Sequence, residues 1–216
     1  MTRAAPNTLN IIRHGDCVPM MRRMEAASVD FILTDPPYLV RYQDRLGRKV
    51  LNDDHGRWIN PAYAEMFRVL KPDSFCLTFY GWNEVDRFMT AWKTAGFRVV
   101  GHLVFAKPYA SSCRYLGHHH EQAYLLAKGD PARPSRTISD VRGWSYTGNR
   151  LHPTQKPVDA LRPLVSTFCP AGGVVFDPFC GSGSSLVAAR LEDRQFLGME
   201  LDYTHYRTAR ERLGVG

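Results

Sequence analysis

The stretch GGVVFDPFCGSGS, residues 172–184, decides the fold class of this chain. Its apolar centre, residues 174–176, is typical of a short buried strand, and a helical pattern begins at residue 183. Glycines at such a strand-to-helix turn let the backbone approach a ligand closely and expose N–H groups at a helix N-terminus. The stretch therefore predicts an α/β sheet with a ligand-binding turn at the carboxyl end of one strand.

Outside this stretch, short apolar runs alternate with amphipathic runs, as strands and helices do in an α/β fold. We predict seven strands, at residues 9–13, 29–34, 74–79, 98–105, 122–127, 174–176 and 195–199. Helices are predicted at residues 17–24, 61–70, 83–95, 157–168, 183–191 and 203–213. Residues 39–58 and 128–150 lack periodicity and are predicted to be loops. We expect a three-layer fold with helices on both faces of the sheet.

The composition is that of a globular chain. The 216 residues, 44% hydrophobic and 23% charged, suit a single domain, residues 1–216. No apolar run approaches the ~20 residues of a membrane span, and the N-terminus lacks the apolar region of a secretory signal. We therefore expect a cytoplasmic protein with no membrane partner. Its five cysteines include no CxxC pair, which predicts reduced thiols.

Positive charge favours a polyanionic partner. The net charge is +7 and the isoelectric point is near 9.3, and basic side chains gain affinity by releasing counterions from phosphates. The basic residues cluster in the two predicted loops, although solvated loop charge is the alternative interpretation. The nucleic-acid-binding residues predicted there are Arg41, Arg45, Arg48, Lys49, Arg133, Arg136, Arg142, Trp144, Tyr146 and Arg150.

A second motif, Asp35-Pro36-Pro37-Tyr38, follows the predicted strand at residues 29–34. Its prolines stiffen the backbone and remove N–H donors, which leaves carbonyl oxygens free to accept. The exocyclic amine of a nucleobase is a poor nucleophile because its lone pair is delocalised into the ring. A carboxylate and a carbonyl that accept its N–H bonds make the nitrogen pyramidal, and a tyrosine face can stack on an extruded base. All of this tetrapeptide is predicted to be catalytic; a simple strand-ending turn is the alternative.

Glu200 points to an adenosine ligand. It ends the predicted strand at residues 195–199, about 19 residues beyond Gly181, where a carboxylate can accept hydrogen bonds from ribose hydroxyls. The glycine-rich turn lacks a full GxGxxG, which argues against a generic dinucleotide site. A carboxylate placed only to favour a helix N-terminus is the alternative for Glu200.

In this order the two motifs resemble the amino-methyltransferases of DNA, specifically the circularly permuted beta class, in which the catalytic tetrapeptide precedes the cofactor motif. The resemblance covers nearly the whole chain and implies a Rossmann-like methyltransferase fold with a seven-stranded, mostly parallel sheet. It is carried by HGDC at 14–17, DPPY at 35–38, LKP at 70–72, HE at 120–121, HPTQKP at 152–157, DPFCGSG at 177–183 and GME at 198–200.

The resemblance implies S-adenosylmethionine as cofactor. It places Thr154 and Lys156 near the carboxylate of the methionine, Asp16 and Cys17 near the adenine, and Glu200 at the ribose. The full set of cofactor-binding residues that it implies is Asp16, Cys17, Asp35, Thr154, Lys156, Asp177, Phe179, Gly181, Ser182, Gly183, Ser184, Glu200 and Leu201.

The implied function is site-specific methylation of adenine N6 in duplex DNA after base flipping. Asp35 favours adenine, since family members acting on cytosine N4 more often carry Ser there and protein-glutamine enzymes Asn. Cytosine N4, RNA adenine, protein glutamine and a catalytically silent DNA-binding regulator remain alternatives. The target-recognition region, at about 129–151, is shorter than is usual in the beta class, so we expect a homodimer. A restriction partner and a solitary enzyme both fit this sequence.

Two rival sites are set aside. The run His118-His119-His120-Glu121 could be read as a metal site, but adjacent side chains of a strand point to opposite faces and do not converge on one ion. Cys180 lies inside the cofactor turn, and no Pro-Cys pair typical of ring-carbon methylation occurs. We therefore expect neither a metal nor a nucleophilic cysteine.

Overall fold

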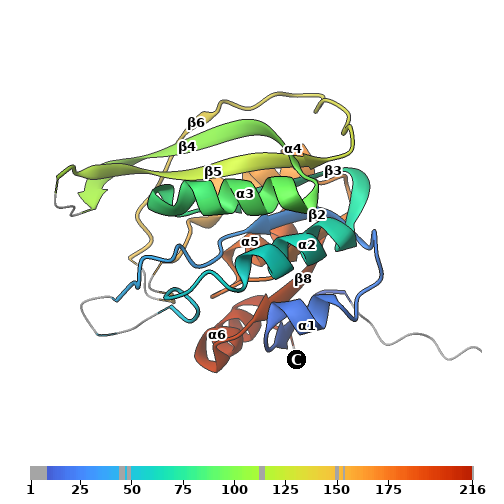
Figure 1. The fold of residues 1–216 in the computed structure, drawn as a ribbon, viewed down its shortest axis with the longest axis horizontal. Helices are drawn as coiled ribbons and strands as arrows, with labels where there is room; N and C mark the ends of the chain where they lie inside the picture. Colours follow the sequence, from blue (N-terminus) through green and yellow to red (C-terminus); the bar gives the residue numbers. More distant parts are fainter. Residues whose placement is uncertain are drawn as a thin grey trace, which may run out of the picture.

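The computed structural model describes residues 9–43, 47, 50–111, 115–148, 151–152 and 154–215. Within them, eight strands form one sheet in the order β1-β8-β7-β2-β3-β5-β4-β6 (Figure 1). The strands are β1 (Ile11–His14), β2 (Val29–Thr34), β3 (Leu70–Phe79), β4 (Arg98–Ser111), β5 (His118–Lys128), β6 (Val141–Gly143), β7 (Val174–Asp177) and β8 (Gln195–Glu200). The helices are α1 (Cys17–Met21), α2 (Ile59–Val69), α3 (Val85–Ala95), α4 (Val158–Phe168), α5 (Ser184–Leu191) and α6 (Tyr203–Leu213), with a 3-10 turn η1 (Trp82–Glu84).

The sheet is mostly parallel, as predicted. Every neighbouring pair from β1 through β8, β7 and β2 to β3 is parallel, and β4 pairs with β6 in parallel. Strand β5 runs against both of its neighbours, β3 and β4. The carboxyl ends of β2, β3, β7 and β8 therefore share one edge of the sheet, and ligands of open α/β sheets bind at that edge.

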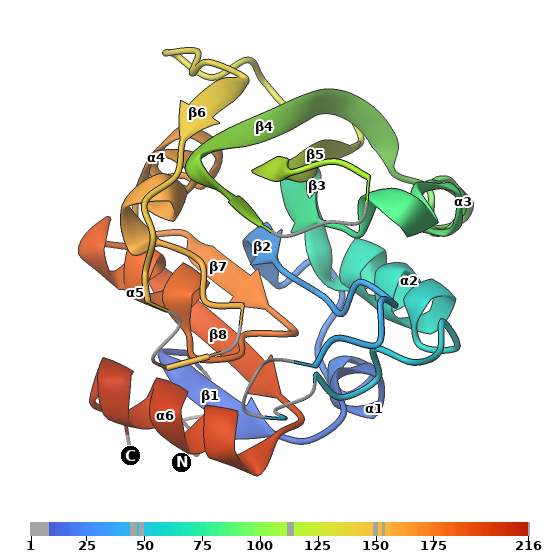
Figure 2. The ribbon, with the colours of Figure 1, turned by 90° about the vertical axis from the view of Figure 1, so that its left-hand side faces the viewer.

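Helices cover both faces, and Figure 2 shows α1, α2 and α3 on one side of the sheet with α4, α5 and α6 on the other. The pleat of β2 explains why. Phe31 and Leu33 contribute to the core under α4, α5 and α6, whereas Ile32 contributes to the core under α1, α2 and α3. All three side chains are almost fully buried, and each such burial stabilises the fold by about 1.5–3 kcal/mol.

The prediction of a loop throughout residues 128–150 was wrong, because β6 lies within it. The strand is held on β4 by hydrogen bonds from Val104 N to the Asp140 carbonyl, at 2.8 Å, and from Trp144 N to the Ala106 carbonyl, at 3.0 Å. Three residues are too short to show the period of two that marks a strand. The strands β4 and β5 are also longer than predicted and form an extended hairpin.

Candidate functional site

A cavity opens at the carboxyl ends of β2, β7 and β8 and brings the two predicted motifs together. It is lined by the whole predicted catalytic tetrapeptide and by most of the predicted cofactor residues. Those lining it are Asp16, Cys17, Asp35, Pro36, Pro37, Tyr38, Thr154, Lys156, Asp177, Phe179, Gly181, Ser182, Ser184, Glu200 and Leu201.

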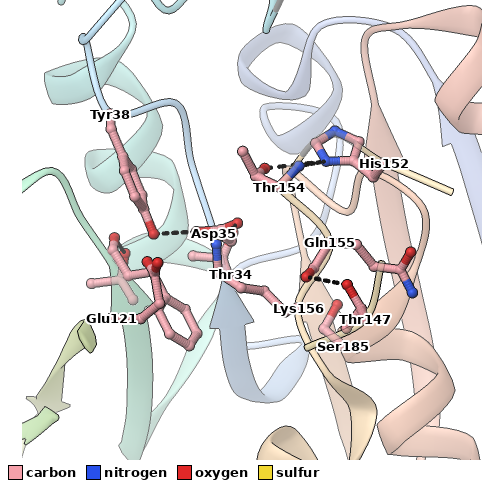
Figure 3. Close-up of polar contacts among 12 residues, drawn as sticks. Thr34, Asp35, Tyr38, Glu121, Thr147, His152, Thr154, Gln155, Lys156 and Ser185 are labelled. Carbon is pink, nitrogen blue, oxygen red and sulfur yellow. Dashed lines mark hydrogen bonds and ion pairs between the residues drawn. The ribbon is translucent and has the colours of Figure 1, made fainter. Parts of the chain in front are cut away.

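Asp35 sits just beyond β2 with both carboxylate oxygens engaged (Figure 3). The Tyr38 hydroxyl donates to its Oδ1 at 2.7 Å, and the Lys156 Nζ lies 2.5 Å from its Oδ2. Burial raises the pKa of the Asp35 carboxyl, and the ammonium of Lys156 acts against that rise. Burial also raises the pKa of Tyr38 well above its ordinary value, so its hydroxyl remains a donor. The site thus pairs a buried carboxylate, whose pKa burial raises, with a neighbouring cation that opposes that rise.

Lys156 joins the catalytic turn to the segment at residues 152–157. Its side chain is 8% exposed, and its Nζ lies 5.3 Å from the centre of the Tyr38 ring and 5.1 Å from that of Phe79. Aromatic faces attract a cation at such distances. The ammonium is therefore held by one carboxylate and two rings inside the cavity. The sequence resemblance implies that it lies near the carboxylate of the cofactor.

Asp177 ties the two motifs to each other. Its Oδ1 accepts hydrogen bonds from the Thr34 hydroxyl, at 2.7 Å, and from Phe179 N, at 3.0 Å. Its Oδ2 accepts from the Ser185 hydroxyl in the first turn of α5. Burial raises the pKa of Asp177 to about 6, and the three hydrogen bonds oppose that rise. Because Thr34 precedes Asp35, this carboxylate fixes the catalytic turn relative to the glycine-rich turn.

Glu200 shapes the other end of the cavity. Its Oε2 accepts from Gly181 N and its Oε1 from Asp202 N, both at 2.7 Å. Burial raises its pKa to about 7. Each carboxylate oxygen retains a further lone pair, so Glu200 can still accept hydrogen bonds from a pair of ligand hydroxyls.

The residues present fit an adenosine ligand that carries a carboxylate. Gly181 has a φ of 50°, and a Cβ there would lie 3.3 Å from the His152 ring, so a side chain at this position would be strained and would crowd the turn. The Phe179 ring packs on Trp58 with centroids 5.0 Å apart. The cavity therefore combines an aromatic wall, a carboxylate for hydroxyl groups and an ammonium for an acid group.

Gly183 and Ser184 contact α6. Gly183 does not line the cavity: it caps α5 with a φ of 79°, and a Cβ there would lie 3.2 Å from that of Ala209 and 3.3 Å from Leu213. The Ser184 hydroxyl accepts from Arg212 at 3.0 Å. Both residues thus fix α6 against the glycine-rich turn, and their predicted role in cofactor binding stays a prediction.

A buried carboxylate that was not predicted from the sequence organises the wall of the cavity at residues 39–42. Asp53 is 3% exposed and accepts from Leu39 N and Tyr42 N, both at 2.6 Å. The indole of Trp58 donates to the Asn52 carbonyl at 3.0 Å. Asp53, Trp58 and the missed residues Thr34, His152 and Ser185 all line the cavity. The adjacent aspartates Asp53 and Asp54 lie in a polar loop, and nothing in the sequence distinguished the one that is buried.

The predicted nucleic-acid residues divide into three groups. Arg41, Arg133, Arg136 and Tyr146 are exposed, and Arg142 is half-buried. Trp144 is corrected: it is 8% exposed and packs on Phe79 and Phe105 with centroids 6.2 and 5.5 Å away, so it belongs to the core. Arg45, Arg48, Lys49 and Arg150 lie outside the described residues.

A metal site and a nucleophilic cysteine were the two alternatives to this site. No group of three metal-ligating side chains in the described part of the chain is placed to hold an ion. No helix described is long and apolar enough to cross a membrane. Burial raises the pKa of the Cys180 thiol well above its ordinary value, which keeps it protonated. Cys17, Cys76 and Cys169 are buried free thiols, and Cys113 lies outside the described residues.

Comparisons with known proteins give a family, a relative and similar structures. The model of the N6/N4 DNA methylase family matches residues 29–211. YubD of Escherichia coli (strain K12) is 54% identical over 201 residues, which are 93% of this chain and 88% of YubD. Its name calls it a methylase and specifies no base.

Two solved structures share the fold. M1.HpyAVI in complex with S-adenosylmethionine has a TM-score of 0.75 at 21% identity, over 94% of this chain and 98% of that one. The cytosine-N4-specific PvuII DNA methyltransferase has a TM-score of 0.76 at 14% identity, over 93% of this chain and 85% of that one.

Proposed function

We propose, from the premise that this chain belongs to the N6/N4 DNA methylase family, that it methylates the N6 amine of adenine in duplex DNA. Membership rests on the family model, which spans residues 29–211, and on the 54% identity to YubD. The chain is thus an S-adenosylmethionine-dependent DNA methyltransferase that acts on an exocyclic amine. The choice of adenine, the duplex substrate and the flipping of the base are the proposal.

The observation that carries the proposal is Asp35 itself, because the family resemblance associates Asp at this position with adenine and Ser with cytosine. Its carboxylate lies in the same cavity as Glu200 and the glycine-rich turn, and the bond from Thr34 to Asp177 fixes the two motifs together at 2.7 Å. Holding two reactants in the right geometry can supply about 7–11 kcal/mol of the barrier. A rigid link between the acceptor and donor sides is what such a reaction needs.

The cofactor supplies a methyl group on a positively charged sulfur when bound. Thr154 and Lys156 would hold its carboxylate, Glu200 its ribose, and Asp16, Cys17 and Phe179 its adenine. Asp35 accepts one N–H of the target amine, and the Pro36 carbonyl accepts the other. Each oxygen of Asp35 has a second lone pair, so the amine can bind while Tyr38 still donates to Oδ1 at 2.7 Å.

Positive charge develops on the nitrogen of the target amine during methyl transfer. The amine nitrogen becomes positive as the methyl group arrives, and an ionised Asp35 stabilises that charge in a site with little water. The Tyr38 ring offers a face for the extruded base. After transfer, the surplus proton on nitrogen passes to the Asp35 carboxylate, whose pKa is already raised by burial.

Mass spectrometry of nucleosides tests the base. Unmethylated plasmid DNA is incubated with the purified chain and methyl-labelled S-adenosylmethionine and then digested. We expect labelled N6-methyladenine, absent with the Asp35→Ala variant, and methylation-sensitive sequencing should place it at one recognition sequence. Labelled N4-methylcytosine instead would overturn the choice of adenine. Binding of cofactor and DNA without transfer would identify a silent regulator.

A further inference from the structure

A tryptophan stands exposed beside the catalytic turn. Trp82 opens η1, directly after β3, and is 57% exposed. The other three tryptophans, Trp58, Trp92 and Trp144, are at most 8% exposed. Single exposed apolar side chains are ordinary on a protein surface, so the position of Trp82 beside the catalytic turn is the informative observation. Trp82 therefore offers an open aromatic face next to the residues that line the cavity.

Gly81 brings the backbone before Trp82 against the catalytic turn. A Cβ at position 81 would lie 2.6 Å from the Tyr38 carbonyl oxygen and 3.0 Å from the Tyr38 Cβ. The position therefore has no room for a side chain, although its φ of −75° would suit any residue. The absence of a side chain permits the contact between Gly81 and Tyr38, and Trp82 follows one residue later.

A histidine from the hairpin fixes the indole on another side. The ring of His118 meets Trp82 edge to face, with centroids 5.5 Å apart and planes at 68°. His118 opens β5, which runs antiparallel to β3, so its first residue lies at the edge where β3 ends. Trp82 thus contacts the hairpin at the carboxyl edge of β3, with more than half of its surface still open.

We propose that Trp82 stacks on the bases that flank the nucleotide extruded from the duplex. The inference rests on the proposed function, because only base extrusion leaves a gap in the stack. Aromatic and apolar side chains inserted at a base step replace lost stacking, and base–aromatic stacking tolerates any sequence. A nucleic acid is favoured over a second copy of this chain because Trp82 adjoins the turn that binds the target base and the chain carries a net charge of +7.

The first test compares native and heat-denatured DNA as methyl acceptors. Single strands have no stack to restore, so Trp82→Ala should slow transfer to duplex by about tenfold and change transfer to single strands by less than about twofold. Trp82→Phe keeps a ring and should recover most of the duplex rate. Leu191→Ala is the matched control, since Leu191 is 53% exposed at the end of α5, on the opposite edge of the sheet.

The second test uses intrinsic fluorescence. Because the other tryptophans are buried, emission from exposed indole comes from Trp82. Duplex DNA added at constant cofactor should quench that emission in the wild type and leave the emission of Trp82→Phe nearly unchanged. Quenching of equal size in both proteins would overturn the proposal.

The outcomes separate this inference from the function on which it rests. If the wild type transfers no methyl group to any DNA, the proposed function fails. If the wild type is active and Trp82→Ala lowers both rates equally, or neither, the stacking role fails. A change of oligomeric mass in Trp82→Ala with an unaltered ratio of duplex to single-strand rates would assign the indole to a second copy and overturn the proposal.

Discussion

Removing the ammonium of Lys156 should move the activity of the enzyme to higher pH. The Nζ of Lys156 lies 2.5 Å from Asp35 Oδ2, inside a site where burial alone raises the pKa of the carboxyl. At an effective dielectric of 20, the attraction at that distance is about 6.6 kcal/mol. Desolvation offsets part of it, and breaking a buried pair typically costs about 3–5 kcal/mol.

In the Lys156→Met variant, Asp35 can take up a proton, which removes the unpaired buried charge and so lowers the free energy lost with the ion pair. A protonated Asp35 cannot accept the N–H of the amine in the same way, and each unit by which its pKa rises above the working pH lowers the ionised fraction about tenfold, or 1.36 kcal/mol. We therefore expect kcat of Lys156→Met at pH 7 to fall at least about tenfold and to recover as the pH rises. Lys156→Arg keeps the charge and should retain the wild-type midpoint.

The assay is the rate of labelled methyl transfer to duplex DNA between pH 5 and pH 10 at saturating cofactor, with cofactor affinity measured by calorimetry at each pH. A Lys156→Met profile parallel to that of the wild type, with the loss appearing only in cofactor affinity, would refute the reasoning. Lys156 would then act on the cofactor alone.

Three further outcomes are expected. Asp35→Ala should lose more than about 90% of transfer, over 1.4 kcal/mol in barrier, while cofactor affinity by calorimetry falls far less. Cofactor affinity should weaken as the pH falls through about 7, because the raised pKa of Glu200 lets its carboxylate take up a proton there. The Glu200→Gln variant should bind the cofactor more weakly than the wild type, with an affinity that does not change with pH. An unchanged cofactor affinity in Glu200→Ala would remove Glu200 from the site. We also propose a homodimer, for which light scattering at micromolar protein should report about twice 24.5 kDa; a monomeric mass combined with a preference for single strands would contradict it.

Elements with strong local signals were predicted well from the sequence. Helix α6 has the predicted bounds, because Asp202 caps its N-terminus by accepting from Thr204 N and His205 N, and Gly214 ends it in the left-handed conformation. Both motifs converge at one edge of the sheet, since the strands that precede them are parallel neighbours.

What the sequence could not predict depends on contacts distant along the chain. Strand β6 exists because β4 offers it a partner, and Trp144 is core because Phe79 and Phe105 lie beneath it. The three hydrogen bonds that the Asp53 carboxylate accepts likewise form only when residues 39–42 fold back over Asp53. From the sequence, Trp144 was predicted to be a nucleic-acid-binding residue, and no role was predicted for Trp82.

The central place of β2 in the sheet has a consequence for how the chain is made. On one side β2 pairs with β3, but on the other Phe31 is aligned with Val175 and Ile32 with Phe176. A ribosome adding about 5–20 residues each second needs roughly 7–29 s to cross the 144 residues from position 31 to position 175. Throughout that interval β2, whose Phe31, Ile32 and Leu33 are almost fully buried in the folded protein, has an unpaired edge. Nascent chains, and chains shortened before β7, should therefore depend on chaperones and aggregate readily without them.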